Sequence, residues 1–223
     1  MTRVVVFDLN ETLIDMSGLD PEFARLFGRA DIRKDWFKQV LQLFLTATVV
    51  GRYRSFDKLA DSALKMMSEQ QSANLDSAAR KTILSKMSEL RVFPDVRPAL
   101  EHLKAANLRL AVLTNSTEKS ARAHLEHNEI TEFFDEILSV DAVKCFKPAA
   151  EAYEYAAKEL EVDVGDIRLV AAHSWDIAGA LAAGCKAAFI QRPAKVLDPE
   201  GDQPDIISRD LGTIAKEIIS NDR

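Results

Sequence analysis

The sequence has little cysteine and no long apolar run. Its two cysteines, Cys145 and Cys185, stand alone in 223 residues and match no disulfide framework or metal-ligand spacing. No stretch approaches the roughly 20 apolar residues of a membrane-spanning helix. The apolar run near the N-terminus is too short for a signal-peptide core and contains Asp8. We therefore expect a cytoplasmic protein with no membrane partner.

A basic segment is also lacking. The net charge is −6, and the 29 lysines and arginines are mixed with 35 acidic residues. Nucleic-acid binding needs a basic patch or stripe, so we expect no nucleic-acid partner. A hydrophobic content of 47% and a charged content of 29% are typical of a soluble globular chain. We find no internal repeat and no low-complexity segment.

The hydrophobic pattern divides the chain into three parts. A β-branched strand at 3–8 comes first, and residues 20 to about 90 then have only helical spacing. From residue 92, strands and helices alternate, which predicts a doubly wound parallel sheet. This predicts an α/β fold, with residues 1–14 and 92–223 as the core domain and 15–91 as an inserted helical cap. The expected strands are 3–8, 108–115, 136–140, 167–174 and, as the last, 186–190; the expected helices are 36–50, 56–67, 75–90, 94–107, 116–128, 148–160 and 175–184.

Polar residues follow the ends of four predicted strands. Each group has a local explanation, because an aspartate after a strand commonly makes a turn and "TNST" is a good helix N-cap. A parallel sheet, however, brings the carboxyl ends of its strands to one edge, where ligands bind. Convergence at that edge favours a functional site over four independent turns. The groups are Asp8, Asn10 and Thr12; Thr114 and Asn115; Lys144 and Lys147; and His173, Ser174 and Asp176.

These residue types indicate a particular chemistry. A carboxylate beside a lysine stays ionised, and an ionised aspartate in a partly dry pocket can form a covalent ester. Thr114, Asn115 and helix N-termini could bind an anion. Asp176 could orient water or bind a cation. The pattern predicts hydrolysis through an aspartyl intermediate, on a small anionic substrate.

Four segments together resemble the motifs of the haloacid dehalogenase superfamily. They are "VVVFDLNETL", "LAVLTNST", "KCFKP" and "LVAAHSWDIAGALAAG", in the family's order. The resemblance covers nearly the whole chain and implies a Rossmann-like core with an aspartate nucleophile, which maps to Asp8. It also places Thr12, Thr114, Asn115, Lys147 and Asp176 around the pocket.

Two motif differences separate this chain from the phosphatases of that superfamily. Those phosphatases use a second aspartate two residues after the nucleophile, where this chain has Asn10. An asparagine cannot exchange a proton near neutral pH. The "GD" of their fourth motif is replaced by Ala172 and His173. Asp8 and Asp176 are the carboxylates that remain, and two are few for magnesium, which prefers several hard oxygen ligands. Mg²⁺ is therefore expected only under the phosphatase alternative.

The metal-free L-2-haloacid dehalogenases are the more similar subgroup. The helical cap, "GRYRSF" at 51–56, "LSVDAVKCFKP" at 138–148 and Trp175–Asp176 all resemble it. The resemblance implies that Asp8 displaces halide and that water then hydrolyses the ester, without cofactor. His173 stands where that subgroup usually has asparagine, and it could orient water or only hydrogen-bond in the pocket wall. The further implied roles are Lys147 as charge partner, Asn115 at the halide, Asn10 in the pocket, Thr12, Thr114 and Tyr153 as positioning residues, and Asp176 in water activation.

One departure concerns the first long cap helix. The subgroup carries an arginine there that contacts the leaving halide, whereas this chain has Phe37. A phenyl group lacks the charge-assisted donors of a guanidinium. Four nearby cationic residues are candidates to replace it: Arg25, Arg29, Arg33 and Lys34.

Three functions thus remain open from sequence. The first is a hydrolase that releases halide from a small 2-haloalkanoic acid, with a small carboxylic acid as its partner and a homodimer as a candidate assembly. The second is a magnesium-dependent phosphatase. The third is a catalytically degenerate binding protein, supported by Phe37 and opposed by Asp8, Lys147 and Asp176.

Overall fold

A six-stranded parallel sheet forms the centre of the protein. A computed structural model describes residues 4–222. The strand order is β3-β2-β1-β4-β5-β6, and every neighbouring pair is parallel. The strand order reverses direction between β1 and β4, and a sheet of this kind binds ligands at the carboxyl ends of the strands at that switch point. The strands are β1 (Val4–Phe7), β2 (Arg109–Thr114), β3 (Glu136–Ser139), β4 (Ile167–Ala171), β5 (Lys186–Ile190) and β6 (Ile206–Ser208).

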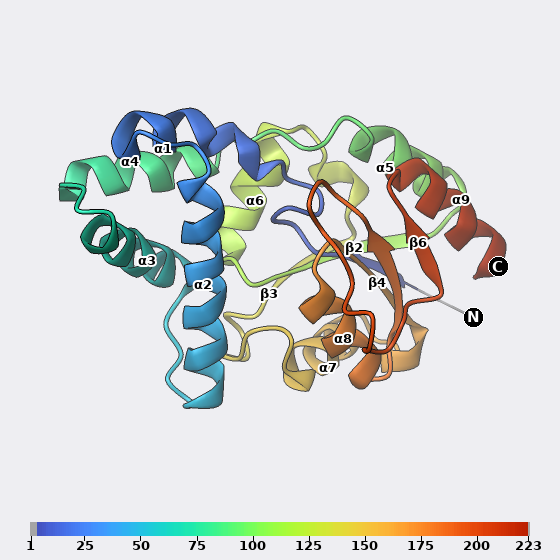
Figure 1. Ribbon diagram of the computed structural model, residues 1–223. Helices are drawn as coiled ribbons and strands as arrows, with labels where there is room; N and C mark the ends of the chain where they lie inside the picture. The colour runs from blue at the N-terminus through green and yellow to red at the C-terminus, as the bar shows by residue number, and fades with distance from the viewer. Residues whose placement is uncertain (1–3, 223) are drawn as a thin grey trace.

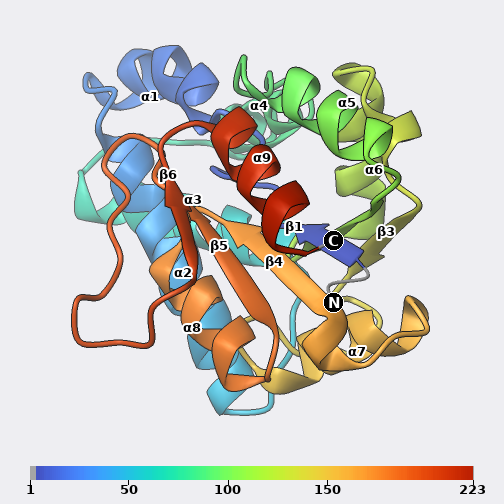
Figure 2. The ribbon, with the colours of Figure 1, turned by 90° about the vertical axis from the view of Figure 1, so that its right-hand side faces the viewer.

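Helices cover both faces of the sheet, as the alternating pattern predicted. Figures 1 and 2 show α5, α6 and α9 on one face and α7 and α8 on the other. Each strand of the sheet centre is therefore buried on both sides, and all four residues of β1 have zero exposure. The helices are α5 (Val96–Ala105), α6 (Glu118–His127), α7 (Ala150–Glu159), α8 (Ser174–Ala182) and α9 (Leu211–Asn221), with short 3₁₀ turns at Thr131–Phe133 and Val164–Asp166.

A helical segment projects from one end of the sheet, at the left of Figure 1. Its two connections to the sheet lie side by side, because the Asp15 N–H donates to the Arg91 carbonyl at 2.8 Å and Ile14 pairs with Val92. Its helices pack on one another through buried faces, and Trp36 Nε1 donates to the Ala60 carbonyl at 3.1 Å. They are α1 (Asp20–Phe27), α2 (Ile32–Val49), α3 (Phe56–Gln70) and α4 (Ser77–Met87), after a 3₁₀ turn at Met16–Leu19.

The sheet continues beyond the strand expected to be its last. The expectation that 186–190 ends the sheet was wrong, because β6 pairs with β5 and α9 packs on α5. With only three residues after a polar loop, β6 has too little pattern to be read from sequence. The ion pairs of Arg168 in β4 hold this end together: its buried guanidinium binds Asp222 at 2.5 and 2.9 Å and Asp205 at 2.5 and 3.0 Å.

Pairing register places the residue after β1 in the middle of the sheet edge. Phe7 is level with Val112 of β2 and Val170 of β4. The Asp8 N–H still donates to the Val170 carbonyl at 3.1 Å, so Asp8 is held between its two neighbouring strands. This edge faces the helical segment.

Candidate active site

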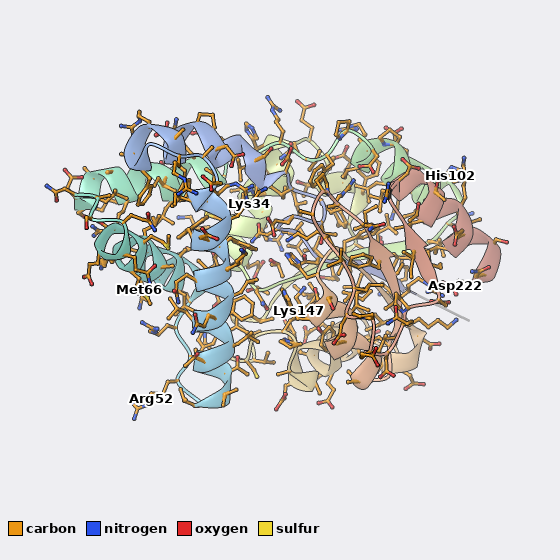
Figure 3. The ribbon with its side chains drawn as sticks, in the orientation of Figure 1. Lys34, Arg52, Met66, His102, Lys147 and Asp222 are labelled. Carbon is orange, nitrogen blue, oxygen red and sulfur yellow. The ribbon has the colours of Figure 1, made fainter. Side chains whose placement is uncertain are left out.

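Lys147 lies between two buried carboxylates. Its ammonium donates to Asp8 Oδ1 at 3.0 Å, to Asp176 Oδ2 at 2.7 Å and to the Leu113 carbonyl at 2.9 Å. These contacts use all three of its N–H donors. The side chains of Lys147 and Asp176 have zero exposure, and that of Asp8 is 6% exposed. Figure 3 shows Lys147 near the middle of the molecule, between α2 and the sheet.

The two carboxylates have opposite protonation preferences. Burial by itself would raise the pKa of Asp8, but the charge of Lys147, followed by His173, holds that pKa well below its usual range. Burial raises the pKa of Asp176, and the charge of Asp8 adds to this, while Lys147 opposes it. One lysine cannot fully compensate two carboxylates. Asp8 is therefore the carboxylate that this arrangement keeps ionised.

Thr12 orients the Asp8 carboxylate. Its hydroxyl donates to Asp8 Oδ2 at 2.7 Å and accepts the Ala172 N–H at 3.0 Å. The hydroxyl is thereby fixed between the β1 loop and the end of β4. Because Lys147 binds Oδ1 and Thr12 binds Oδ2, the plane of the Asp8 carboxylate is determined by contacts on both oxygens.

Tyr153 supports Asp176 from α7. Its hydroxyl donates to Asp176 Oδ1 at 2.6 Å and lies 3.1 Å from the Asp176 carbonyl. Close approach of α8 makes this possible: a Cβ at Gly179 would lie 2.4 Å from Pro148 Cβ and 2.7 Å from the Tyr153 hydroxyl. Both oxygens of Asp176 are thus engaged, one by Lys147 and one by Tyr153.

The residues after β2 position the backbone of Lys147. Asn115 Oδ1 accepts the Lys147 N–H at 2.9 Å, and Asn115 Nδ2 donates to the Lys147 carbonyl at 3.3 Å. The Thr114 hydroxyl accepts the Ser116 N–H at 3.0 Å. Asn10 Nδ2 donates to Ser116 Oγ at 3.1 Å. The structure thus brings Asn10, Thr114 and Asn115 into one buried cluster beside Asp8.

His173 connects Asp8 to a second acidic residue. Its Nδ1 lies 3.4 Å from Asp8 Oδ2, and its Nε2 lies 3.1 Å from Glu11 Oε2. The ring stacks on Trp175 with a centroid distance of 5.0 Å and makes a tilted contact with Phe37 at 6.1 Å. Burial by itself would lower the pKa of His173, but contacts with Asp8 and Glu11 raise it above its ordinary value.

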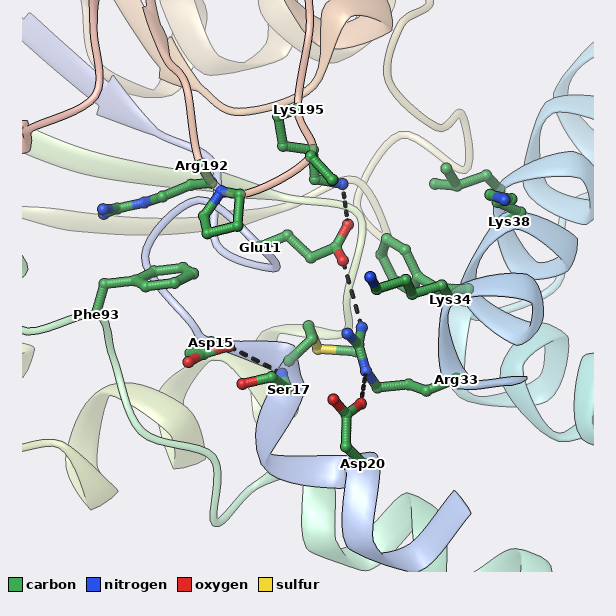
Figure 4. A pocket seen from close by; sticks show the side chains of 15 residues that line it. Glu11, Asp15, Ser17, Asp20, Arg33, Lys34, Lys38, Phe93, Arg192 and Lys195 are labelled. Atoms are coloured by element: carbon green, nitrogen blue, oxygen red, sulfur yellow. Dashed lines mark hydrogen bonds and ion pairs between the residues drawn. The ribbon is translucent and has the colours of Figure 1, made fainter. Parts of the chain in front are cut away.

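Glu11, like Glu129 and Glu161, has a positive φ. Its φ is +61°, in the left-handed region that costs a residue with a Cβ about 1 kcal/mol or more. Its carboxylate contacts His173, lies 3.5 Å from Arg33 Nη1 and pairs with the Lys195 ammonium. Burial by itself would raise the pKa of Glu11, but His173 and Lys195 lower it to about 2. Figure 4 shows Glu11 between Lys195 and Arg33.

A cavity of about 540 Å³ opens on the outer side of Glu11. Asp8 and His173 are not in its wall; they lie behind Glu11, which His173 contacts. Five cationic side chains border the cavity. They are Arg33, Lys34, Lys38, Arg192 and Lys195, and the wall also includes Glu11, Asp15, Asp20, Phe37, Leu41 and Phe93 (Figure 4).

Phe37 lies in the cavity wall, on the same face of α2 as a buried arginine. Arg33, Phe37 and Leu41 follow one another at four-residue spacing, so they form one stripe of α2, and all three line the cavity. Arg33 is buried and binds Asp20 Oδ1 at 2.5 Å. Among the other candidate cations, Lys34 also lines the cavity, whereas Arg25 and Arg29 are exposed and pair locally with Glu22 and Asp31.

Sequence reasoning missed three residues of this region: Glu11, Lys195 and Arg192. Arg192 Nε donates to the Thr12 carbonyl at 3.0 Å and Nη1 to Asp95 at 2.8 Å, while Nη2 is buried without a hydrogen-bond partner within residues 4–222. A glutamate inside a strand-to-helix turn gives no distinct signal, and two cations in the loop 191–205 have no periodicity. A φ above zero at Glu11 is visible only in the structure.

Two negative observations apply to residues 4–222. No group of three or more histidine, cysteine, aspartate or glutamate side chains is placed to hold a metal ion. No helix there is long and apolar enough to cross a membrane.

Fold and site together define an α/β protein with a carboxylate–lysine–carboxylate centre beneath a helical segment. The family model of haloacid dehalogenase-like hydrolases matches residues 2–184. An (S)-2-haloacid dehalogenase of Pseudomonas sp. strain YL is 30% identical over 203 residues, which cover 90% of this chain and 88% of that protein. An (S)-2-haloacid dehalogenase 1 of Pseudomonas sp. strain CBS-3 is 31% identical, with 85% of each chain covered.

The fold is likewise similar to a solved structure. The L-2-haloacid dehalogenase of Xanthobacter autotrophicus superposes with a TM-score of 0.93 at 23% identity and covers 99% of both chains. The chain belongs to the haloacid dehalogenase-like hydrolase family. The resemblance seen in the four motifs and the predicted parallel α/β sheet are confirmed.

Proposed function

We propose that this protein hydrolyses the carbon–halogen bond of small 2-haloalkanoic acids. The observation that carries the proposal is the Asp8 carboxylate, buried and held ionised by Lys147 behind a cation-lined cavity. A buried anionic nucleophile suits displacement of halide, and the cationic wall suits a carboxylate substrate. Relatives named for (S)-2-haloacids make that enantiomer the first substrate to test.

In the first step, Asp8 Oδ2 attacks the carbon that bears the halogen and the halide leaves with the bonding electrons. Oδ2 is the oxygen that faces His173, on the side of the cavity, whereas Oδ1 is bound to Lys147. Thr12 aligns the attacking oxygen. The product of this step is an ester of Asp8. Burial of the carboxylate removes water that would otherwise solvate and weaken the nucleophile.

In the second step, water adds to Cγ of the Asp8 ester. Negative charge then develops on Oδ1, which lies 3.0 Å from the Lys147 ammonium, within the range at which a donor stabilises an oxyanion. Collapse of the intermediate breaks the bond between Cγ and Oδ2. A 2-hydroxy acid leaves with that oxygen, and Asp8 keeps the oxygen of water.

The substrate carboxylate binds the cations of the cavity. Arg33 supplies a guanidinium from the α2 stripe, one turn before Phe37, and Lys34 and Lys195 add ammonium groups to the cavity wall. A planar guanidinium matches a carboxylate with two donors. Phe37 packs on the His173 ring and borders the space for the substituent at carbon 2. In this proposal Arg33 is the cation that α2 supplies in the absence of the family arginine, and its partner is the substrate carboxylate, not the halide.

The remaining residues position the reacting groups. Asn115 aligns the backbone of Lys147, and Tyr153 fixes Asp176, which in turn holds the Lys147 ammonium. These contacts explain why polar residues follow separate strands. No step in this scheme uses a metal ion or an organic cofactor.

A parallel assay of halide and phosphate release tests the proposal. We expect halide from (S)-2-chloropropionate, unaffected by EDTA, and no phosphate from small phosphate esters. Asp8→Asn should fold normally and release no halide. In water enriched in heavy oxygen, multiple turnovers should leave label on the Asp8 carboxylate. Magnesium-dependent phosphate release would replace this proposal with the phosphatase alternative, and release of neither ion would favour a binding protein.

A further inference from the structure

We propose that His173 is the general base for hydrolysis of the Asp8 ester, and that Glu11 is its positioning residue. This inference rests on the proposed function and adds a catalytic relay to it. The relay runs from Asp8 Oδ2 through the imidazole ring to Glu11 Oε2, over contacts of 3.4 and 3.1 Å.

The arrangement contains each part that such a relay needs. A nucleophile lies beside one ring nitrogen, and a carboxylate binds the other nitrogen, which fixes the tautomer and the ring plane. Stacking on Trp175 and a tilted contact with Phe37 restrain the ring further. Nδ1 has no hydrogen-bond partner of good geometry within residues 4–222. This nitrogen is therefore available for a water that approaches Asp8 Cγ.

Asp176 is poorly placed for the same role. Its Oδ2 accepts from Lys147 and its Oδ1 accepts from Tyr153, and its side chain has zero exposure. Taking a proton from water would require it to give up one of these contacts. His173 lies between Asp8 and the residue that borders the cavity, so it is nearer to the side from which water enters.

The charge on Asp8 regulates the proton on His173. The charged groups around the ring are Asp8 from the β1 end, Glu11 from the following turn and Lys195 from the loop after β5, with Arg33 of α2 beyond Glu11. In the resting enzyme the two carboxylates raise the pKa of His173. Esterification removes the charge of Asp8, so that pKa falls and the ring becomes a base when the ester is present.

The proton balance of the cycle closes. After halide leaves, the imidazolium releases one proton to solvent. The neutral ring then takes a proton from water as its oxygen bonds to Cγ, and returns that proton to the departing 2-hydroxy acid oxygen. The Asp8 carboxylic acid finally passes its proton to Nδ1, which restores the ion pair. The sum is one haloacid and one water converted to one hydroxy acid, one halide and one proton.

The structure of Glu11 supports a role beyond packing. A residue with a Cβ is kept at φ +61° where glycine would fit without strain. Lys195 and Arg33 hold the carboxylate from two sides, so that it points at His173 Nε2. A solvated surface glutamate would not need three cationic partners.

Rapid mixing with (S)-2-chloropropionate tests the base. His173→Gln keeps a polar side chain but cannot accept a proton. We expect a burst of one halide per protein, followed by turnover slowed roughly 100-fold or more. Intact-protein mass spectrometry should show the acid esterified to Asp8. A merely structural role would slow both steps together, without a burst or an adduct.

Two further variants test the positioning of His173 through the pH profile of ester hydrolysis. Glu11→Gln removes a negative charge beside the ring, so the ascending limb should move about one unit to lower pH. Lys195→Gln removes a positive charge and should move the limb to higher pH. Opposite shifts are specific to titration of His173, because loss of fold would not produce them.

Several outcomes would overturn the inference. One is that the wild type releases halide but His173→Gln accumulates no ester. Another is that the ester accumulates in Asp176→Asn instead. A third is that the pH profile of ester hydrolysis does not shift in Glu11→Gln and Lys195→Gln. Failure of the proposed function is a different result, in which the wild-type protein itself releases no halide.

Discussion

Replacement of Arg33 tests whether Arg33 is the cation that binds the substrate carboxylate. Arg33→Met keeps an unbranched apolar stem of similar length and removes every donor. Truncating one partner of a buried, hydrogen-bonded charge pair costs about 2 to 5 kcal/mol, which is roughly 30-fold to a few thousand-fold in kcat/KM. We expect a fall of that size in kcat/KM for (S)-2-chloropropionate, because the Arg33 side chain is only 5% exposed and little water can replace it.

The fold should survive this substitution. Arg33 binds Asp20, whose side chain is 35% exposed and can be hydrated, and Glu11, which keeps Lys195 and His173 as partners. We expect a loss of about 1 to 2 kcal/mol in the free energy of unfolding, below the 3 to 5 kcal/mol typical of a fully buried pair. Urea denaturation measures this loss independently of activity.

Arg25→Met is the matched control. Arg25 carries the same charge nearby, but its side chain is 57% exposed, pairs with Glu22 and does not line the cavity. Its kcat/KM should match that of the wild type. Near-normal kcat/KM in a folded Arg33→Met protein, or loss of activity in Arg25→Met, would show that the substrate is held elsewhere.

Three further predictions concern packing and charge. Gly179→Ala should affect the rate of halide release more strongly than the stability of the fold. The added Cβ would lie 2.4 Å from Pro148 Cβ and displace this residue, which follows Lys147. Kinetics and thermal unfolding measure the two effects separately. Arg168→Met should cost about 3 kcal/mol in urea denaturation and leave kcat unchanged, since the buried Asp222, which lies far from the cavity, loses its paired guanidinium and keeps the partly exposed Lys186; an unchanged stability would contradict the prediction. The pKa of His173 is raised above 6.5, so its contribution to stability is full below pH 6.5 and is lost as pH rises through the raised value. The stability difference between wild type and His173→Gln should therefore shrink from acid to alkaline pH, and a growing difference would refute the assigned charge.

The sheet and the Asp8–Lys147–Asp176 centre were predictable because each depends on local pattern. An apolar run that ends in a polar residue predicts a buried strand, and it places that polar residue at the carboxyl end of the strand, where ligands bind. The parallel order then brings 8, 147 and 176 together, although they are far apart in sequence. The N-cap of α4 is likewise set by local sequence, because the Asp76 side chain before the helix accepts the Ala79 N–H.

The cavity wall was less predictable because its contacts depend on tertiary placement. Four cations near the start of α2 were equivalent in sequence, and only packing shows that Arg33 points inward while Arg25 and Arg29 pair with neighbours. Lys195 reaches Glu11 across 184 positions from a loop without regular structure. A three-residue strand such as β6 has too few residues for any periodicity.

The stripe of Arg33, Phe37 and Leu41 has a consequence for how substrate range can change. These side chains come from α2, whereas Asp8, Lys147 and the other reacting groups come from the strand ends of the sheet. Substitutions along one helix face can thus reshape the cavity while the nucleophile and its lysine keep their own hydrogen bonds. A library of substitutions confined to positions 33, 37 and 41 samples charge, ring size and volume with few variants. We expect its members to differ in the size and charge of the acid that they accept, while the nucleophile stays intact.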